Sequence, residues 1–207
     1  MTVATQHPDR PYCGVDGPLG PGVERVHMVG IGGAGMEGLA RLLLAMGYGI
    51  TGSDASEGPV IDALRDSGIA VFHGHGEDQT RGADVLVYSA AVPPSNPERQ
   101  AAAAAGVRQL RRAEVLGLLS RKLDTVAVAG THGKTTTASL VANALHAVGR
   151  DPTVVVGGWV EGRTQSVHGA EPLMVVEADE YDRSFLELES WLAVVTNIEA
   201  EHVDCYE

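Results

Sequence analysis

Short apolar runs alternate along the chain with segments whose apolar residues recur at helical spacing. In the first half, the runs that predict strands cover residues 25–29, 49–51, 69–72, 84–88 and 107–110. Leu39, Leu42, Leu43 and Met46 share one face of a predicted helix, and further helices are predicted at 60–64, 97–105 and 113–119. Strands that alternate with helices predict a parallel sheet whose carboxyl-terminal edge receives ligands.

The second half repeats this alternation. Strands are predicted at 126–129, 153–156, 173–176 and 193–195, and a helix at 139–148. The last three of these strands are apolar and each runs into polar residues or glycine, which is typical of buried parallel strands that deliver side chains to one edge.

A glycine-rich turn follows the first strand. It reads Gly30-Ile31-Gly32-Gly33-Ala34-Gly35, which satisfies the G-x-G-x-x-G fingerprint of a dinucleotide-binding turn. Asp54 lies about 20 residues beyond this turn, where an acid would meet a ribose hydroxyl. Alone, the pattern suggests a nicotinamide cofactor, and a plain glycine-rich turn with an exposed aspartate is the structural alternative.

A second glycine-rich turn, Gly130-Thr131-His132-Gly133-Lys134-Thr135-Thr136, joins a strand to a helix. Its glycines let backbone amides turn toward an anion, Lys134 can place a charge on β- and γ-phosphate oxygens, and the Thr135 hydroxyl can bind Mg²⁺. The general P-loop has a glycine where Val128 stands, so this motif is a shortened form. The alternative is an ordinary turn in which Lys-Thr occurs by chance.

Acidic residues follow the strand at 173–176. Glu177 comes directly after it, so its carboxylate can hold Mg²⁺ at the strand end. Three further acids fit a solvated loop: Asp179, Glu180 and Asp182. His202 lies shortly beyond the strand at 193–195, and the sequence is equally compatible with a functional role and an ordinary surface imidazole.

Other polar residues lie at predicted strand ends of the first sheet. His73 and His75 are two residues apart, but no Cys or acid stands beside them at ligand spacing, so we favour contact with a nucleotide over a metal. Ser89 directly follows the strand at 84–88, at the same edge.

Composition narrows the classes of function. The 207 residues are 44% hydrophobic, enough to supply a core, and the formal charge of −12 argues against non-specific nucleic-acid binding. The two cysteines make no disulfide framework, and no apolar run approaches the length of a membrane span. We therefore expect a cytoplasmic protein without a nucleic-acid or membrane partner.

Two phosphate-binding turns in one chain suggest two domains, because one sheet rarely carries two such turns. We expect residues 1–23, which are rich in Pro and Gly, to form a flexible tail. The fold class is then α/β: a Rossmann-like parallel-sheet domain over 24–120 and a P-loop domain over 121–207.

These motifs together resemble the Mur ligases. The resemblance lies in residues 27–36, 52–54, 88–91, 96–98, 129–137, 177–186 and 195–202. The run Gly32-Gly33-Ala34-Gly35-Met36 points to the alanine-adding member, and the shortened P-loop is the family's own form.

The resemblance implies an ATP-dependent ligase of peptidoglycan precursor synthesis. ATP would phosphorylate the lactyl carboxylate of UDP-N-acetylmuramate, and the amine of L-alanine would attack the resulting acyl phosphate. The implied catalytic residues are Lys134, His132, Glu177 and His202, of which Lys134 stabilises the transferring phosphate and His132 lies near the reacting carboxylate. Thr135, Glu177 and His202 would hold Mg²⁺.

The resemblance also assigns the two glycine-rich turns. The first domain would bind the UDP-sugar through Gly30, Gly32, Gly33, Ala34, Gly35, Asp54, His73 and Ser89. The second would bind ATP through Gly130, Thr131, His132, Gly133, Lys134, Thr135 and Thr136.

Some features depart from the family pattern. Ala90 stands where Ser is usual, and Glu201 stands where Asp is usual. Family members are longer, so we expect an inactive fragment with a truncated central domain and no C-terminal domain. The alternatives are a muramyl-tripeptide recycling ligase, a non-catalytic UDP-sugar-binding fragment and an NAD-dependent oxidoreductase, and the oligomeric state stays open.

Overall fold

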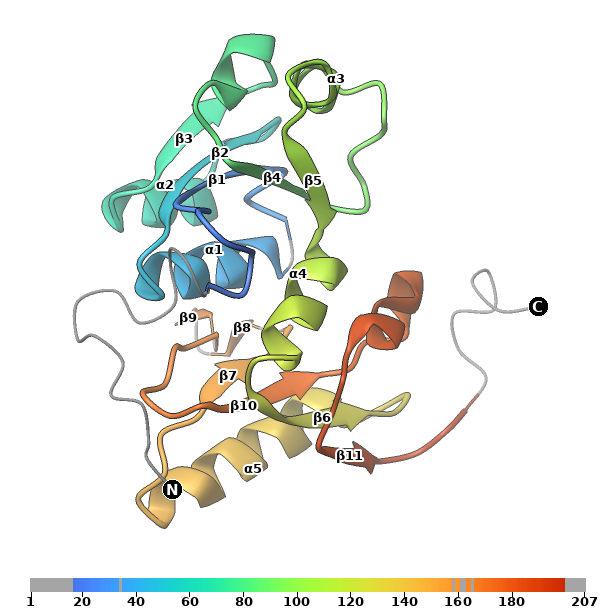
Figure 1. Ribbon diagram of the computed structural model, residues 1–207. Helices are drawn as coiled ribbons and strands as arrows, with labels where there is room; N and C mark the ends of the chain where they lie inside the picture. The colour runs from blue at the N-terminus through green and yellow to red at the C-terminus, as the bar shows by residue number, and fades with distance from the viewer. Residues whose placement is uncertain (1–16, 34, 158, 161–162, 165, 200–207) are drawn as a thin grey trace.

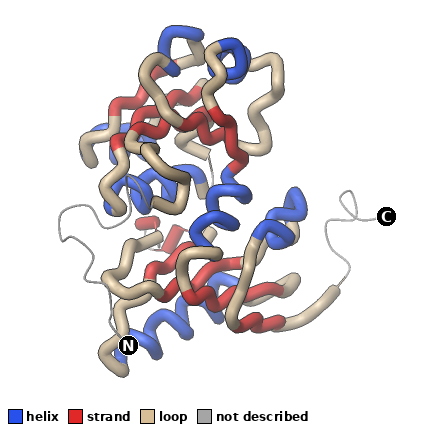
Figure 2. The backbone as a smooth tube through the Cα atoms, in the orientation of Figure 1, coloured by secondary structure: helices blue, strands red, loops and turns tan. Residues whose placement is uncertain are grey.

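The computed structural model describes residues 17–199 except 34, 158, 161–162 and 165. Two parallel sheets lie one above the other in the view of Figure 1, and a helix runs from the first to the second. Figure 2 shows the same arrangement as two groups of strands, each with helices beside it.

The first sheet has five parallel strands in the order β3-β2-β1-β4-β5. They are β1 (Arg25–Val29), β2 (Gly49–Asp54), β3 (Ala70–His73), β4 (Val85–Tyr88) and β5 (Arg108–Arg111). The chain starts at the middle strand, works outward to one edge, and then returns to build the other side. In a sheet of this order, ligands bind at the carboxyl ends of the strands beside the reversal point.

Helices cover both faces of this sheet because its strands are apolar on both. On one face, α1 (Met36–Ala45) and α2 (Pro59–Asp66) pack against Val26 and Met28 of β1. On the other face, η1 (Glu77–Thr80) and α3 (Pro97–Ala104) lie together, and Ala102 packs against Val29 and Leu86. Adjacent residues of β1 therefore face different helices, as the alternation of a strand requires.

The second sheet has four parallel strands in the order β11-β6-β10-β7. They are β6 (Asp124–Ala129), β7 (Thr153–Val155), β10 (Leu173–Glu177) and β11 (Leu192–Val195). Helix α5 (Lys134–Ala147) covers one face through Ala138 and Ala142, whose small side chains allow close approach to the strands. The 3₁₀ helix η2 (Tyr181–Glu187) follows β10, and the short strands β8 (Trp159–Val160) and β9 (Arg163–Thr164) form an antiparallel pair.

Helix α4 (Arg112–Ser120) connects the two sheets. Its buried residues Val115, Leu116 and Leu119 belong to the same apolar cluster as Met28 in the first sheet and Val176 in the second. Gly117 allows α4 to approach η2 closely, because a Cβ added there would lie 2.5 Å from the backbone oxygen of Glu187. The core therefore continues from one sheet to the other through α4.

The predicted order of strands and helices is confirmed, with shifts at several boundaries. Strand β2 continues to Asp54 instead of ending at Thr51, and α5 begins at Lys134 instead of Ser139. The pair β8–β9 has no clear signal in the sequence. No helix in the described part of the chain combines the length and the apolar character that crossing a bilayer requires.

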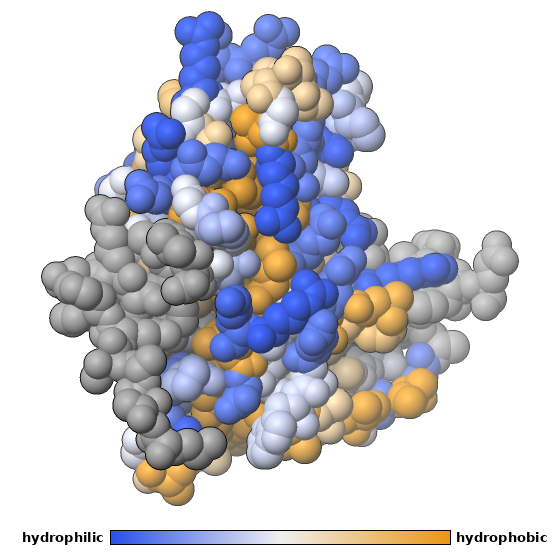
Figure 3. All heavy atoms as spheres, in the orientation of Figure 1, coloured by the Kyte–Doolittle hydropathy of each residue, from blue (hydrophilic) through white to orange (hydrophobic). Residues whose placement is uncertain are grey.

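Strand β11 differs from its prediction as a buried strand. It lies at the edge of the second sheet and pairs only with β6 among the described strands, so its side chains remain largely exposed. Leu192 is 47% exposed, Val195 56% and Ile198 87%. Figure 3 shows apolar surface in this region of the molecule. An apolar run predicts a strand here, but it does not determine whether the strand is central or at the edge.

Residues 17–23 differ from the expected tail. Leu19 is fully buried, Val23 is buried, and the Arg108 guanidinium donates a hydrogen bond to the Leu19 carbonyl oxygen (2.9 Å). The turn-rich composition of this segment gives no periodic signal, but one leucine in it completes the core. Residues 1–16 lie outside the described residues.

We predict that Gly117→Ala destabilises the protein by about 1–3 kcal/mol, although alanine is favoured over glycine in a helix by ~1 kcal/mol. The added Cβ would push α4 away from the Glu187 backbone, which cannot move aside as a flexible side chain would. Urea denaturation of the two proteins measures the difference.

Gly49→Ala is the matched control, because a Cβ there meets no atom closer than 3.7 Å. Its stability should change by no more than ~0.5 kcal/mol. A Gly117→Ala protein as stable as the parent would show that α4 and η2 are not held at contact distance.

Candidate functional site

The carboxyl ends of the first sheet bring together most of the residues predicted for the UDP-sugar. The glycine turn follows β1, Asp54 ends β2, His73 ends β3 and Ser89 follows β4. A Cβ on Gly30 would lie 3.4 Å from the Ser89 Cβ, so these two strand ends are in contact. Ala34 lies outside the described residues.

Most backbone amides of the first glycine turn are engaged within the protein. The amides of Gly30 and Ile31 donate to the Ser53 carbonyl oxygen (2.8 and 3.0 Å), and the Gly33 amide donates to the Gly30 carbonyl oxygen (3.1 Å). The Gly32 amide donates to Asp54 Oδ2 (2.8 Å). These glycines therefore set the shape of the turn, and their amides are not free donors for a phosphate.

Asp54 has a different local role from the predicted ribose contact. Its second oxygen, Oδ1, accepts from the Ser56 amide (2.9 Å), so both carboxylate oxygens hold backbone in place. A pocket of about 330 Å³ opens beside it, lined by Gly32, Gly33, Asp54, Glu57 and Ile61 among others. Asp54 lines a pocket next to the turn, and its contact with a ribose stays a prediction.

A buried carboxylate, Glu98, is the centre of a polar cluster that the sequence did not indicate as a site. Glu98 lies in the first turn of α3 and is fully buried. Its Oε2 accepts from the Ser53 hydroxyl (2.7 Å) and lies 3.4 Å from His75 Nδ1 and 3.7 Å from His27 Nε2. The Gly76 amide donates to Oε1 at 3.4 Å.

The neighbours of Glu98 determine its protonation. Burial by itself raises the pKa of the Glu98 carboxyl, but His27, Ser53 and His75 outweigh it and hold the pKa below its ordinary value. His27 is fully buried, its Nδ1 pairs with the Thr51 hydroxyl (2.8 Å), and its Nε2 finds no hydrogen-bond partner. This cluster links β1, β2 and α3 near the carboxyl ends of the strands, the edge of the sheet where a ligand is expected (the ligand edge).

His73 and His75 point to different partners. His75 joins the Glu98 cluster and its Nδ1 lies 3.1 Å from the Ser53 hydroxyl, whereas His73 pairs with the exposed Glu57 (3.4 Å). In the described parts of the chain no three His, Cys, Asp or Glu side chains gather as a metal site.

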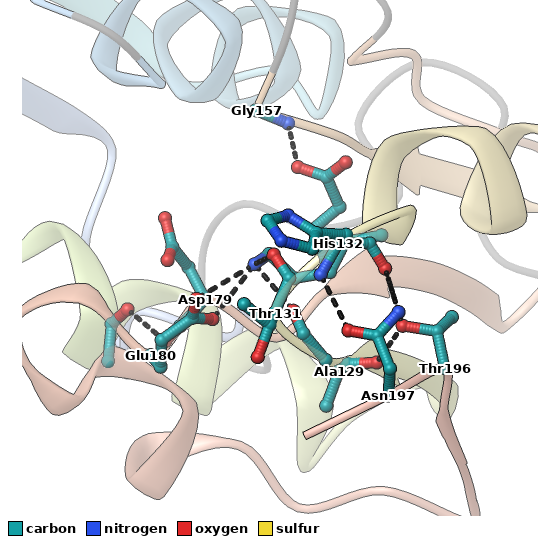
Figure 4. A network of polar contacts seen from close by, with 12 residues as sticks. Ala129, Thr131, His132, Gly157, Asp179, Glu180, Thr196 and Asn197 are labelled. Atoms are coloured by element: carbon teal, nitrogen blue, oxygen red, sulfur yellow. Dashed lines mark hydrogen bonds and ion pairs between the residues drawn. The ribbon is translucent and has the colours of Figure 1, made fainter. Parts of the chain in front are cut away.

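The second glycine turn is held by the segment that follows β11. The Asn197 carbonyl oxygen accepts from the Thr131 amide (3.2 Å), and its side chain exchanges hydrogen bonds with the His132 backbone (2.9 and 3.0 Å). The Thr196 hydroxyl donates to the His132 carbonyl oxygen (2.7 Å), as Figure 4 shows. Gly130 has a φ of 132°, and a Cβ there would lie 2.1 Å from the Thr196 hydroxyl, so this position requires glycine.

Lys134 lies at the first turn of α5, after Gly133 in the left-handed region (φ 81°). Its Nζ donates to the Gly130 carbonyl oxygen (2.6 Å) and to both carboxylate oxygens of Glu180 (2.9 and 3.0 Å). The prediction of a solvated loop is wrong for Glu180, whose side chain is only 21% exposed. The chain folds β10 beside β6, and this pairing brings a carboxylate from beyond β10 to the lysine.

Glu177 is the last residue of β10, opposite Val128 of β6 in the register. Its Oε2 accepts from the Gly157 amide (2.6 Å), the contact at the top of Figure 4. Its Oε1 is buried and has no hydrogen-bond partner. A buried carboxylate oxygen without a donor, on the strand beside the one that leads into the second glycine turn, has the chemistry of a Mg²⁺ ligand.

The other residues predicted for this site are only partly described. His132 is exposed, and its Nε2 lies 3.7 Å from Glu199. Thr135 and Thr136 lie in the first turn of α5, where the backbone amides of a helix can bind an anion. His202, predicted as a second metal ligand, lies outside the described residues.

Residues 25–123 match the family described as "Mur ligase family, catalytic domain". The chain is 50% identical over 185 residues to a UDP-N-acetylmuramate–L-alanine ligase of Acidithiobacillus ferrooxidans, covering 89% of this chain and 40% of that protein. It is 49% identical over 187 residues to the ligase of the same name from Chlorobium phaeovibrioides, covering 88% and 39%.

The chain belongs to the Mur ligase family. Among solved Mur ligases, UDP-N-acetylmuramate-alanine ligase of Thermotoga maritima is similar at TM-score 0.79 and 33% identity, with 88% of this chain and 43% of that one covered. A second, the UDP-N-acetylmuramate:L-alanyl-gamma-D-glutamyl-meso-diaminopimelate ligase from Neisseria meningitides, gives TM-score 0.78 and 30% identity, covering 89% and 64%. The chain therefore spans less than half the length of the curated Mur ligases named above, 40% and 39%.

We predict that Glu98→Gln lowers the stability of this Mur ligase chain at pH 7 by about 1–3 kcal/mol, because the buried histidines lose a charged partner. The pKa of the Glu98 carboxyl in the folded protein lies below its ordinary value of 4.5, so the ionised form stabilises the protein above that pH. This contribution is lost as the pH falls through the folded pKa. The difference between the urea midpoints of parent and variant should therefore be smaller at about pH 3.5 than at pH 7.

Exposed Glu77→Gln is the control and should change neither midpoint noticeably. A stability difference between parent and Glu98→Gln that stays constant over this pH range would contradict an ionised Glu98.

Proposed function

We propose that the chain supplies the nucleotide-binding part of an ATP-dependent ligase that joins L-alanine to UDP-N-acetylmuramate in peptidoglycan precursor synthesis. The observation that carries the proposal is the second strand edge. There, Lys134 follows the glycine turn and Glu177 presents an unpartnered buried oxygen on the neighbouring strand. A cation and a carboxylate oxygen without a donor, both beside one glycine turn, fit the transfer of a phosphoryl group.

In this proposal, the first turn of α5 receives the phosphates of ATP. Lys134 exchanges its contact with Glu180 for phosphate oxygens and stabilises the charge that develops on them. Thr135 and Glu177 would hold Mg²⁺, with His202 as a further ligand. When bound, Mg²⁺ would neutralise phosphate charge and orient the oxygens for in-line transfer. His132 would lie near the carboxylate that accepts the phosphoryl group.

The substrate carboxylate becomes an acyl phosphate when it attacks the γ-phosphorus and ADP leaves. The amine of L-alanine then attacks the acyl carbon, and inorganic phosphate leaves as the amide forms. Catalysis of both steps rests mainly on positioning and on charge neutralisation, because neither step needs a covalent enzyme intermediate.

The first strand edge would bind the UDP-sugar, with the pocket beside Asp54 next to the shaped glycine turn. Identity to curated relatives supports alanine as the amino acid, because two proteins that match at 49–50% carry that name. Similarity to solved structures does not distinguish alanine from a peptide as the group that is joined, because an alanine ligase and a peptide ligase match at TM-scores of 0.79 and 0.78. We expect this reaction in the cytoplasm, because it consumes nucleotide substrates.

We predict that Lys134→Ala weakens ATP binding at least tenfold, on the order of what loss of a charge-assisted contact to phosphate costs, while UDP-N-acetylmuramate binding changes by less than about threefold. Calorimetric titration of both ligands measures this. Lys122→Ala is the matched control, because the chain's other lysine is exposed in the turn after α4. Loss of both ligands in Lys134→Ala would contradict two separate nucleotide sites.

We also predict that Glu177→Gln removes the Mg²⁺-dependent part of ATP binding. The expected loss is about tenfold in the presence of Mg²⁺ and small in the presence of a chelator, because only the charged carboxylate attracts the ion. Titrations with and without Mg²⁺ separate the two effects. Glu189→Gln removes a surface partner of Arg121 and serves as the control. Equal Mg²⁺ dependence in parent and Glu177→Gln would rule out a metal ligand at this position.

A further inference from the structure

The fifth strand of the first sheet also delivers a polar side chain to the ligand edge. Strand β5 ends at Arg111, and Arg112 begins α4 immediately afterwards. Since all five strands are parallel, Arg112 lies at the same edge as the glycine turn after β1, Asp54, His73 and Ser89. Four of these strand ends carry residues predicted to bind the ligand, and Arg112 stands at the fifth.

The Arg112 guanidinium lies directly against the glycine turn. A Cβ added to Gly35 would lie 2.7 Å from Nε, Cζ and Nη2 of Arg112. Gly35 is also the residue that precedes α1, in the left-handed region at a φ of 75°. The guanidinium therefore occupies the space beside the N-terminus of α1, where helix amides favour an anion.

Arg112 is partly buried, and its inner end lacks a partner within the described residues. Its Nε is buried without a hydrogen bond, and no ion pair of its side chain is found within the described residues. Burial lowers the pKa of Arg112, and the more distant carboxylates of Asp179 and Glu177 oppose this only in part. By contrast, the neighbouring Arg111 pairs with Glu187 (2.7 Å) and Glu114 (3.4 Å). A partly buried cation whose inner nitrogen lacks an acceptor is favoured by a ligand that supplies an anion.

The remaining donors of the turn lie beside Arg112. The amides of Gly30, Ile31, Gly32 and Gly33 all donate within the protein. The amide of Gly35 has no acceptor among the described residues. The Gly35 N–H and the Arg112 guanidinium are therefore two adjacent donors without acceptors at the carboxyl-terminal edge of the first sheet.

We propose that Arg112, together with the Gly35 amide, binds anionic oxygens of the muramyl nucleotide. This rests on the proposed function, because that function supplies the ligand. The guanidinium would donate hydrogen bonds to two oxygens side by side, and phosphate and carboxylate groups both present such a pair of acceptors. Asp179 and Glu177, which belong to the second strand edge, also interact electrostatically with Arg112, so its charge is felt at both edges.

The test is a set of calorimetric titrations of the whole chain and of its Arg112→Gln variant. UDP-N-acetylmuramate should bind the variant about 10–100-fold more weakly, as expected for losing a charged hydrogen-bonding group. Uridine, which has no phosphate, should bind both proteins equally. Arg112→Lys should recover part of the affinity, since it restores the charge without the planar fork.

The identity of the anion follows from two further ligands. If UDP and UDP-N-acetylglucosamine lose as much affinity as UDP-N-acetylmuramate, Arg112 binds the diphosphate. If only UDP-N-acetylmuramate loses affinity, Arg112 binds its lactyl carboxylate. Either result supports the proposal.

Arg111→Gln is the matched control, since the adjacent arginine already has protein partners, and it should leave all these affinities within about threefold. Equal binding of UDP-N-acetylmuramate by parent and Arg112→Gln would overturn the proposal. A purely structural role would weaken uridine, UDP and ATP alike and lower the melting temperature, and it would overturn the proposal too. Absence of UDP-N-acetylmuramate binding in the parent would instead overturn the proposed function.

Discussion

The burial of α4 between the two sheets is the interaction on which both candidate sites depend. The helix begins where β5 ends and stops four residues before β6, so it has little freedom to change the distance between the sheets. Val115, Leu116 and Leu119 are at most 4% exposed, and each contributes roughly 1.5–3 kcal/mol by leaving water. The two strand edges are therefore held by packing, and the polar residues on them need not maintain the arrangement of the sheets.

Within each edge, a neighbouring strand end determines the shape of the glycine turn. The backbone of Ser53 and the side chain of Asp54 hold the first turn, and Thr196 and Asn197 hold the second. In both turns another chain segment comes close to a glycine: a Cβ would lie 2.8 Å from Ile61 Cδ1 at Gly32 and 2.1 Å from the Thr196 hydroxyl at Gly130. The backbone amides that are not used within these turns lie at the start of the following helix. Each glycine turn therefore serves mainly to position a helix N-terminus, whose amides can bind an anion.

The sequence predicts what depends on local pattern, and it misses what depends on distant partners. Strand positions and the two glycine turns follow from apolar runs and from the spacing of Gly, Lys and Thr, because these are properties of neighbouring residues. The Glu98 cluster joins residues 45 positions apart, and the Lys134–Glu180 pair joins residues 46 apart, so no local pattern reveals either. Leu19 is hidden for a different reason, since a single leucine among turn residues has no periodicity. Arg112 is predictable from the sequence, because it directly follows the last strand of the first sheet and so lies at the same edge as the other candidate residues.

The ion pair between Lys134 and Glu180 has a consequence for the strength of nucleotide binding. A phosphate can reach the ammonium only by displacing a carboxylate that already has two contacts at 2.9–3.0 Å in a largely shielded position. The measured affinity is then the difference between two attractions, and an anion of higher charge density gains most from the exchange. A singly charged metabolite would gain little over Glu180. In the proposed ATP site, the Glu180 carboxylate would thereby act as an internal competitor that favours polyphosphates over singly charged anions.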